Sequence, residues 1–160
     1  MNPKEWFRKM IGVMFAVPII LKVRQLSLSM GREAAIKAYG PRITSIAKYS
    51  LKFWVPDIAS PSEFDRMKTK MKSRFWIWKP FFDITVTLDD RDAFKLRVAN
   101  CPFCEALQQL GYPELAPYVC EGDWKKAREN KNKWGFERSC QIGTGGDYCD
   151  HTYTRLAASL

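Results

Sequence analysis

The residues of this chain that could do chemistry lie close together in the sequence. All five cysteines and the single histidine fall within the last 60 residues. The series begins with Cys101-Pro102-Phe103-Cys104, continues with Cys120 and Cys140, and ends with Cys149-Asp150-His151. Any thiol or imidazole chemistry therefore belongs to the C-terminal part of the chain.

The first pair of cysteines carries the strongest local signal. The spacing Cys101-x-x-Cys104 places two sulfurs within one helical turn, where they can share a metal ion or form a redox disulfide. Pro102 predicts the start of a helix with Cys101 as its cap. No second Cys-x-x-Cys or Cys-x-x-His unit follows, and burial as small apolar side chains also accounts for isolated cysteines. Metal binding, redox chemistry and simple burial all stay open.

Two further patterns bring a carboxylate or an imidazole near a thiol. Cys120 and Asp123 are three residues apart and share one helix face, as two ligands do, or a nucleophile and its base. A solvated carboxylate at a helix end is the alternative. His151 is expected in the last strand, on the same side of the pleat as Cys149 and opposite Asp150. A lone strand histidine is more often a core or surface residue than a ligand.

The first half of the chain is predicted to be helical. Asn2-Pro3 predicts a cap and a first turn for a helix that ends near Gly31. A second helix is expected over residues 32–52. Ser62 is expected to cap a short third helix, in which Lys68 and its neighbouring lysines face solvent. Residues 1–74 thus form a helical, basic half.

The second half, residues 75–160, carries all the cysteines and the histidine. β-forming residues become dense from Phe75 onward, and alternation around turn residues predicts two hairpins, over 83–98 and 134–156. Two short helices, 102–110 and 113–124, and a charged connector, 125–133, lie between them. We therefore predict one α+β domain, with N-terminal helices packed on a four-stranded antiparallel sheet built from two hairpins, in the order ααα-ββ-αα-ββ.

The net charge of +9 is spread unevenly. Residues 1–80 carry 16 basic and 5 acidic side chains, a net +11, and residues 81–160 carry 10 and 12, a net −2. The positive charge of residues 1–80 is explained by basic helices with a solvated face, or by attraction of a small anionic substrate. The chain has no RNA-binding aromatic motif, phosphate loop, zinc-finger spacing, Gly-x-Ser-x-Gly or His-Glu-x-x-His, so nucleic acid is not an expected partner.

The N-terminal segment and the cysteine count bear on the cellular compartment. An apolar run over residues 10–21 follows basic residues as in a signal peptide, but Pro18 interrupts it and no small-x-small cleavage site follows. The run is also short for a bilayer. An odd number of cysteines argues against a secreted disulfide scaffold. We predict a buried helix in a cytoplasmic protein, with peripheral membrane contact as the minor alternative and oligomerisation left open.

The aromatic content is high, with six tryptophans in 160 residues. Such rings fill a core, or they line a pocket for a flat ligand.

Five short strings in the second half share their order and spacing with a known family. They are Val98-Ala99-Asn100-Cys101-Pro102-Phe103, Leu110-Gly111-Tyr112-Pro113-Glu114-Leu115, Cys120-x-x-Asp123, Phe136-Glu137-Arg138 and Gly145-Gly146-Asp147-x-Cys149-Asp150. Together they resemble the L-2-amino-thiazoline-4-carboxylic acid hydrolase family and, more remotely, the 4-vinyl reductase domain. The likeness covers residues 94–153 and is only architectural over the helical first half.

The resemblance implies a bacterial-type enzyme that opens a cyclic isothiourea. Water adds at the carbon between nitrogen and sulfur, and the ring C–S bond breaks to give a carbamoyl-cysteine. The matched residues with side chains suited to this are Cys101, Cys120, Asp123, Arg138, Asp147, Cys149 and Asp150. We take Cys101, Cys120, Asp123 and Arg138 as the catalytic set. In this hypothesis the thiols form a metal-assisted site, Asp123 is the base and Arg138 binds the substrate carboxylate.

A metal site would draw its ligands from five residues, namely Cys101, Cys104, Cys120, Cys149 and His151. His151 stands where relatives usually have an aromatic residue. Zinc, manganese or an iron–sulfur cluster would suit such a set, with no cofactor as the other case. Two further classes of function stay open. One is a cysteine-ligated metal or iron–sulfur protein with a redox, reductase or sensing role, and the other is a non-catalytic module that binds a small ligand.

Overall fold

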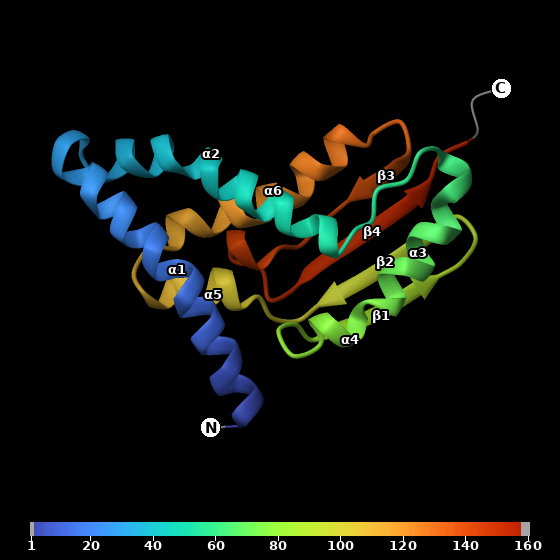
Figure 1. Cartoon of the computed structure of the whole chain (residues 1–160), viewed down its shortest axis with the longest axis horizontal. Coiled ribbons are helices and arrows are strands. Elements are labelled where there is room, and N and C mark those ends of the chain that lie inside the picture. Colours follow the sequence, from blue (N-terminus) through green and yellow to red (C-terminus); the bar gives the residue numbers. More distant parts are fainter. Residues whose placement is uncertain (1, 158–160) are drawn as a thin grey trace.

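The first half of the chain is helical, as predicted. In the computed structural model, which describes residues 2–157, helix α1 (Pro3–Met30) begins at Asn2, whose side chain accepts a hydrogen bond from Lys4 N at 3.0 Å. The chain turns at Gly31, which has a φ of 82°, a value open to glycine because it lacks a Cβ. Helix α2 (Arg32–Ser50) then leads away from the turn, so that the two helices form a V (Figure 1).

Helix α1 is long and apolar enough to cross a membrane by length and composition alone. Here, 28% of its most apolar window is buried, on a side that includes Ala16, Ile19 and Val23. This side packs against α2 and against α5 (Pro102–Gln109). Met14 and Leu21, on the opposite side, are exposed. The helix therefore forms one wall of the core.

A glycine in α1 makes the approach to α5 possible. Gly12 is buried, and a Cβ at this position would overlap the carbonyl oxygen of Pro102 and lie 3.1 Å from the Cβ of Ala106. Pro102 begins α5 directly after Cys101. The contact between these two backbones thus sets where the first cysteine lies.

We expect Gly12→Ala to lower the free energy of unfolding by about 1–3 kcal/mol, because the overlap with Pro102 requires a backbone shift. The gain in helix propensity, up to about 1 kcal/mol, acts in the opposite direction. Urea unfolding followed by circular dichroism measures the change. Gln25→Ala, on the exposed side of the same helix, is the control and should be nearly neutral. A stabilised Gly12→Ala variant would contradict this packing.

The segment after α2 differs from the prediction in three details. Ser62 lies inside a short 3-10 turn, η2 (Pro61–Glu63), and does not cap helix α3 (Phe64–Ser73). Lys68 is buried, and its ammonium group donates to the carbonyl of Asp90 and pairs with Asp89 at 3.2 Å. Its long aliphatic stem crosses the apolar interface before the charge reaches these oxygens.

The third detail is that the aromatic run from Phe75 forms a helical turn, α4 (Phe75–Trp78), where β-forming residues suggested strand structure. The rings of Phe75 and Trp78 pack on Trp54, with centroids 5.8 Å and 5.4 Å from it. Packing of aromatic side chains outweighs their strand propensity.

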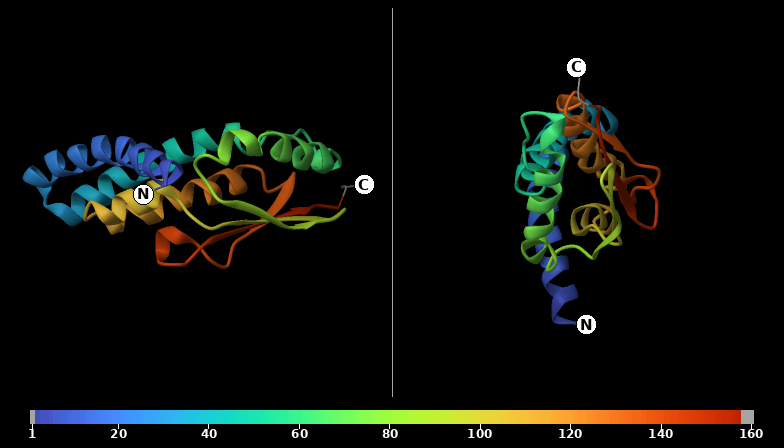
Figure 2. Two further views of the ribbon diagram at one scale, coloured as in Figure 1. Left: turned by 90° about the horizontal axis from the view of Figure 1, so that it is seen from below. Right: turned by 90° about the vertical axis from the view of Figure 1, so that its right-hand side faces the viewer.

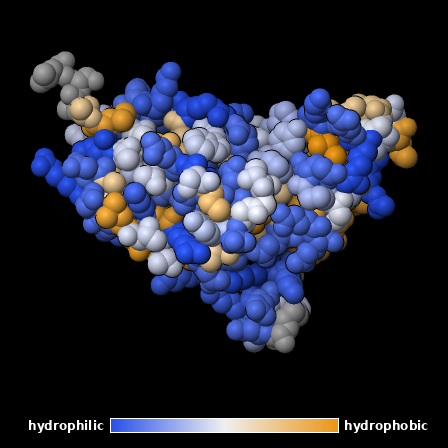
Figure 3. All heavy atoms as spheres, turned by 180° about the vertical axis from the view of Figure 1, so that it is seen from behind, coloured by the Kyte–Doolittle hydropathy of each residue, from blue (hydrophilic) through white to orange (hydrophobic). Residues whose placement is uncertain are grey.

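The sheet has the predicted composition of two antiparallel hairpins. Its strands are β1 (Ile84–Asp89), β2 (Ala93–Val98), β3 (Trp134–Glu137) and β4 (Cys149–Arg155), in the spatial order β1-β2-β4-β3. In β2 and β4 alternate residues are buried, so that Cys149, His151 and Tyr153 face the helices. The other side of the molecule, seen from behind, is mainly hydrophilic (Figure 3), as expected of a sheet with one solvated face.

Helix α6 (Ala116–Glu129) follows α5 and a 3-10 turn, η3 (Pro113–Leu115), and packs against α2. It is longer than predicted, because residues 125–129 are helical and not a connector. Lys126 in this extension is buried and pairs with Asp57. The run of charged residues therefore did not indicate a loop, because one of its lysines is buried and forms an ion pair.

The core consists of two clusters. The helical cluster joins α1, α2, α5 and α6 through residues such as Val23, Ile43 and Leu107. The sheet cluster joins α3 to the strands through residues such as Phe64, Phe94 and Tyr153. Figure 2 shows helices α1 to α4 along one side of the molecule and the sheet along the other. The boundary between the two clusters is where the functional residues lie.

Candidate functional site

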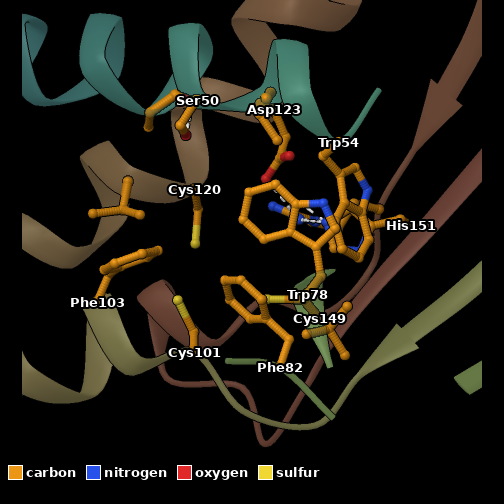
Figure 4. Close-up of a pocket in the computed structure, with 15 residues that line it drawn as sticks. Ser50, Trp54, Trp78, Phe82, Cys101, Phe103, Cys120, Asp123, Cys149 and His151 are labelled. Carbon is orange, nitrogen blue, oxygen red and sulfur yellow. Dashed lines mark hydrogen bonds and ion pairs between the residues drawn. The ribbon is translucent and has the colours of Figure 1, made fainter. Parts of the chain in front are cut away.

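A pocket opens at the boundary between the helical cluster and the sheet cluster. It encloses about 720 Å³ when the space open to solvent at its mouth is included. Segments far apart in the sequence line it: the end of α2 with Trp54, the 78–82 segment, the N-terminus of α5, helix α6 and strand β4. Figure 4 shows thiols, aromatic rings and one carboxylate around a common space.

Three thiols line this pocket. Cys101 lies at the N-cap of α5 as predicted, Cys120 on α6 and Cys149 at the start of β4 (Figure 4). Cys104 lies behind them, with no exposed surface, and its Sγ is 3.8 Å from the carbonyl oxygen of Ala116. Cys140 does not line the pocket, and all five cysteines are free thiols.

The thiols influence one another's protonation. Contacts with the thiols of Cys104 and then Cys149, helped by the positive charge of Arg138, hold the pKa of Cys120 well below its ordinary value. The pKa of Cys104 is raised by its contacts with Cys101 and Cys120 and by burial. The pKa of Cys149 is raised by its contact with Cys120 and by burial. The cluster therefore favours one thiolate, at Cys120, between thiols that keep their protons.

An ion pair and an imidazole form the polar wall of the pocket. Arg138 Nη2 donates to Asp123 Oδ2 at 2.8 Å, and their side chains are 2% and 15% exposed. The same Nη2 contacts His151 Nε2, which lies 3.7 Å from Asp123 Oδ2. Burial would raise the pKa of Asp123, but the charge of Arg138 and contacts with His151 hold it below its ordinary value. Asp123 is thus ionised and paired.

His151 is neutral in this setting. Burial and the charge of Arg138 both lower its pKa, more than Asp123 raises it. Because Nε2 accepts from Arg138, the ring proton belongs on Nδ1. Nδ1 is buried and has no hydrogen-bond partner within the described part of the chain.

The guanidinium of Arg138 is held on several sides. Its Nε donates to the carbonyl oxygen of Asp150 at 3.2 Å, and Nη1 lies 3.4 Å from Gln141 Oε1. The Asp150 carboxylate in turn accepts from Ser139 N at 3.0 Å and from Cys140 N at 2.6 Å. Asp150 therefore positions the segment that carries Arg138, while Asp147 is exposed outside the pocket. Binding of a substrate carboxylate by Arg138 stays a prediction.

The predicted metal ligands are near one another but do not converge. Within residues 2–157, no group of three or more His, Cys, Asp or Glu side chains is arranged to hold a metal ion. The His151 nitrogen on the polar wall contacts the guanidinium of Arg138, so a second cation there would meet a like charge. These residues do not fit a zinc, manganese or iron–sulfur site as they stand.

Sequence reasoning missed the aromatic wall of the pocket. This wall consists of four residues, Trp54, Trp78, Phe82 and Phe103. In the sequence, only the abundance of aromatic residues indicated a pocket for a flat ligand. Their positions depend on α4 and on the turn after α2. The β-rich composition of residues 75–78 obscured this arrangement.

The fold and the site define a class of protein: an α+β domain with a thiol-lined, largely apolar small-molecule pocket between a helical layer and an antiparallel sheet. Comparison with known families agrees with the sequence resemblance. The family described as L-2-amino-thiazoline-4-carboxylic acid hydrolase matches residues 10–153, and the chain belongs to this family. A search of functionally curated proteins finds no match.

Proposed function

We propose that this protein is a thiol-dependent hydrolase that opens a small ring containing an isothiourea or amidine-type carbon. The observation that carries the proposal is the thiolate-favouring position of Cys120, which faces a small-molecule pocket beside a paired carboxylate. A thiolate that persists near neutral pH is a ready nucleophile. Membership of the hydrolase family supports the same reaction class.

In the first half of the proposed reaction, the Cys120 thiolate adds to the carbon between nitrogen and sulfur of the protonated ring. The C=N electron pair moves to nitrogen. When that pair returns, the ring C–S bond breaks, and the leaving sulfur takes the proton of Cys149. Cys149 suits this role because it contacts Cys120 and keeps its proton when Cys120 is ionised.

In the second half, water adds to the same carbon and passes a proton to Asp123. The bond from carbon to Cys120 then breaks and returns the thiolate. The product oxygen gives its remaining extra proton to Cys149, and Asp123 releases to solvent the proton that the substrate brought. The product is an open-chain urea that carries a thiol. Asp123 lines the pocket as this role requires.

We expect Cys120→Ala to reduce turnover of L-2-amino-thiazoline-4-carboxylate, or of a ring analogue that the wild type opens, by roughly a thousandfold or more, because the nucleophile is lost. A thiol reagent reports product formation. Cys140→Ala removes a thiol outside the pocket and should retain wild-type turnover. Matching circular dichroism and urea midpoints show that both variants fold. Undiminished turnover in a folded Cys120→Ala variant would disprove the proposal.

A second candidate is a non-catalytic module that binds a small ligand. The aromatic lining of the pocket favours it, because stacking surfaces hold flat rings without any reaction. Binding with no ring opening by the wild-type protein would select this candidate.

A further inference from the structure

The described residues that line the pocket offer no unpaired cation to an anionic ligand. Among the described residues that line it, Arg138 supplies the one cationic side chain, and Asp123 neutralises it at 2.8 Å. The guanidinium of Arg138 also contacts the Asp150 carbonyl oxygen, Gln141 and His151. With His151 neutral and Cys120 favouring the thiolate, the ionised pocket carries a net negative charge.

The rest of the lining suits a flat, apolar body. Four aromatic rings, from Trp54, Trp78, Phe82 and Phe103, join Val98 and Val119 around the cavity. A small polar substrate would leave most of these rings in contact with water, whereas an apolar substituent would cover them.

Two lining residues also carry buried N–H donors without partners. They are Trp78 Nε1 and His151 Nδ1, and both atoms are shielded from solvent. Buried donors are nearly always satisfied in folded proteins, so an unpaired donor beside a cavity points to an acceptor on a ligand. Both donors are neutral, and a neutral acceptor such as an amide oxygen meets them without introducing a charge.

We propose that the pocket selects a ring whose amidine-type head lies toward Asp123 and Cys120 and whose body is an uncharged, apolar substituent with a neutral hydrogen-bond acceptor. It disfavours the carboxylate-bearing ring after which the family is named. This inference rests on the proposed function for the reacting head, and it differs from the sequence-based expectation of a small anionic substrate. A carboxylate placed in this pocket meets the charges of Asp123 and Cys120 and finds no unpaired cation, so that only the two neutral N–H donors could offset its desolvation. A protonated amidine head is attracted instead, because it faces the negative charges of Asp123 and Cys120 and the faces of the aromatic rings.

Three matched probes test the inference: L-2-amino-thiazoline-4-carboxylate, its primary carboxamide, and its anilide, in which a phenyl group extends the amide. The first two share their shape and differ in charge, and the third adds an apolar ring. Titration calorimetry on Cys120→Ala gives dissociation constants free of turnover and tests the effect of the paired Arg138–Asp123 charges alone. A thiol reagent gives kcat/KM for the wild type, in which the Cys120 charge is also present. We expect the carboxamide to bind at least about tenfold more tightly than the carboxylate, and the anilide at least about tenfold more tightly again.

Trp78→Phe provides the control for the donor, because it keeps an aromatic ring and removes the N–H. Loss of one neutral hydrogen bond should weaken anilide binding by roughly threefold to tenfold and leave carboxylate binding nearly unchanged. Equal weakening of all three probes would assign Trp78 to packing alone and remove the acceptor from the proposed ligand.

The outcomes separate the inference from the proposed function. Tightest binding of the carboxylate, or no binding of any probe, overturns the inference. Opening of the carboxylate alone overturns the inference and supports the hydrolase. Tight binding of the anilide with no ring opening of any probe supports the ligand class and rejects the hydrolase.

Discussion

We expect Arg138→Met to lower the free energy of unfolding at neutral pH by about 3–5 kcal/mol, the largest stability effect among the site residues. The guanidinium is 2% exposed, and its removal leaves Asp123 ionised in a buried site without its partner. Urea unfolding followed by tryptophan fluorescence measures the loss. Methionine retains the apolar volume of the side chain, so the loss reports on charge and hydrogen bonding.

The loss should depend on pH with a definite sign. Asp123 has a folded-state pKa below its ordinary value of 3.8, so the ion pair contributes stability above that pH and less as the pH falls through the folded value. The difference between the wild type and Arg138→Met should therefore shrink in acid. A constant difference at all pH values would count against an uncompensated Asp123 charge.

Two control variants sharpen this expectation. Arg128→Met removes the ion pair between Arg128 and Glu121, two side chains that are 61% and 42% exposed. It should lower the free energy of unfolding by less than about 1 kcal/mol. Adding Asp123→Leu to Arg138→Met removes the stranded charge and should recover part of the loss. If the double variant is less stable than Arg138→Met alone, then the two residues act independently.

We expect Cys104→Ala to move the acid limb of the pH–rate profile to higher pH, although Cys104 does not line the pocket. Cys104 is the first contributor to the low pKa of Cys120, so its removal should bring that pKa back toward the ordinary thiol value of 9.0. Once the pKa of Cys120 exceeds the working pH, each further rise of one in this pKa reduces the thiolate fraction about tenfold. Turnover should fall most near about pH 6 and recover as the pH rises toward 9.

The conservative variant distinguishes positioning from structure. Cys104→Ser retains a donor toward Cys120 and should restore much of the wild-type profile, whereas Cys104→Ala should not. Plots of kcat/KM against pH for the three proteins provide the measurement. A uniform loss at every pH, with the limb unmoved, would assign Cys104 to packing.

Much of the fold could be predicted because its local signals agree with its tertiary structure. Asn2 and Gly31 mark the ends of α1, and alternation predicts β2 and the side of β4 on which His151 lies. The failures have a common cause. Phe75–Trp78 and residues 125–129 were judged by propensity and charge, but partners distant in the chain, Trp54 and Asp57, decide their conformation.

The site was predicted in part. One pocket is lined by six of the predicted residues, namely Cys101, Cys120, Asp123, Arg138, Cys149 and His151. The Cys-x-x-Cys spacing could not show that Cys101 lines the pocket while Cys104 lies behind it. This difference depends on how the first turn of α5 is oriented toward the pocket. Nor could spacing show that Arg138 is already paired, since that pairing brings together a helix and a hairpin.

The position of the pocket between two core clusters has a consequence for how the protein unfolds. Trp54 and Trp78 belong to or pack on the sheet cluster, and Val98 and Cys120 to the helical cluster, yet all four line the pocket. An empty pocket gives the two clusters few shared contacts at this point, so heating can loosen one before the other. A ligand in the pocket touches both clusters and links their melting. Its signature in calorimetry is a narrower and higher transition, with van 't Hoff and calorimetric enthalpies that draw together as the pocket fills.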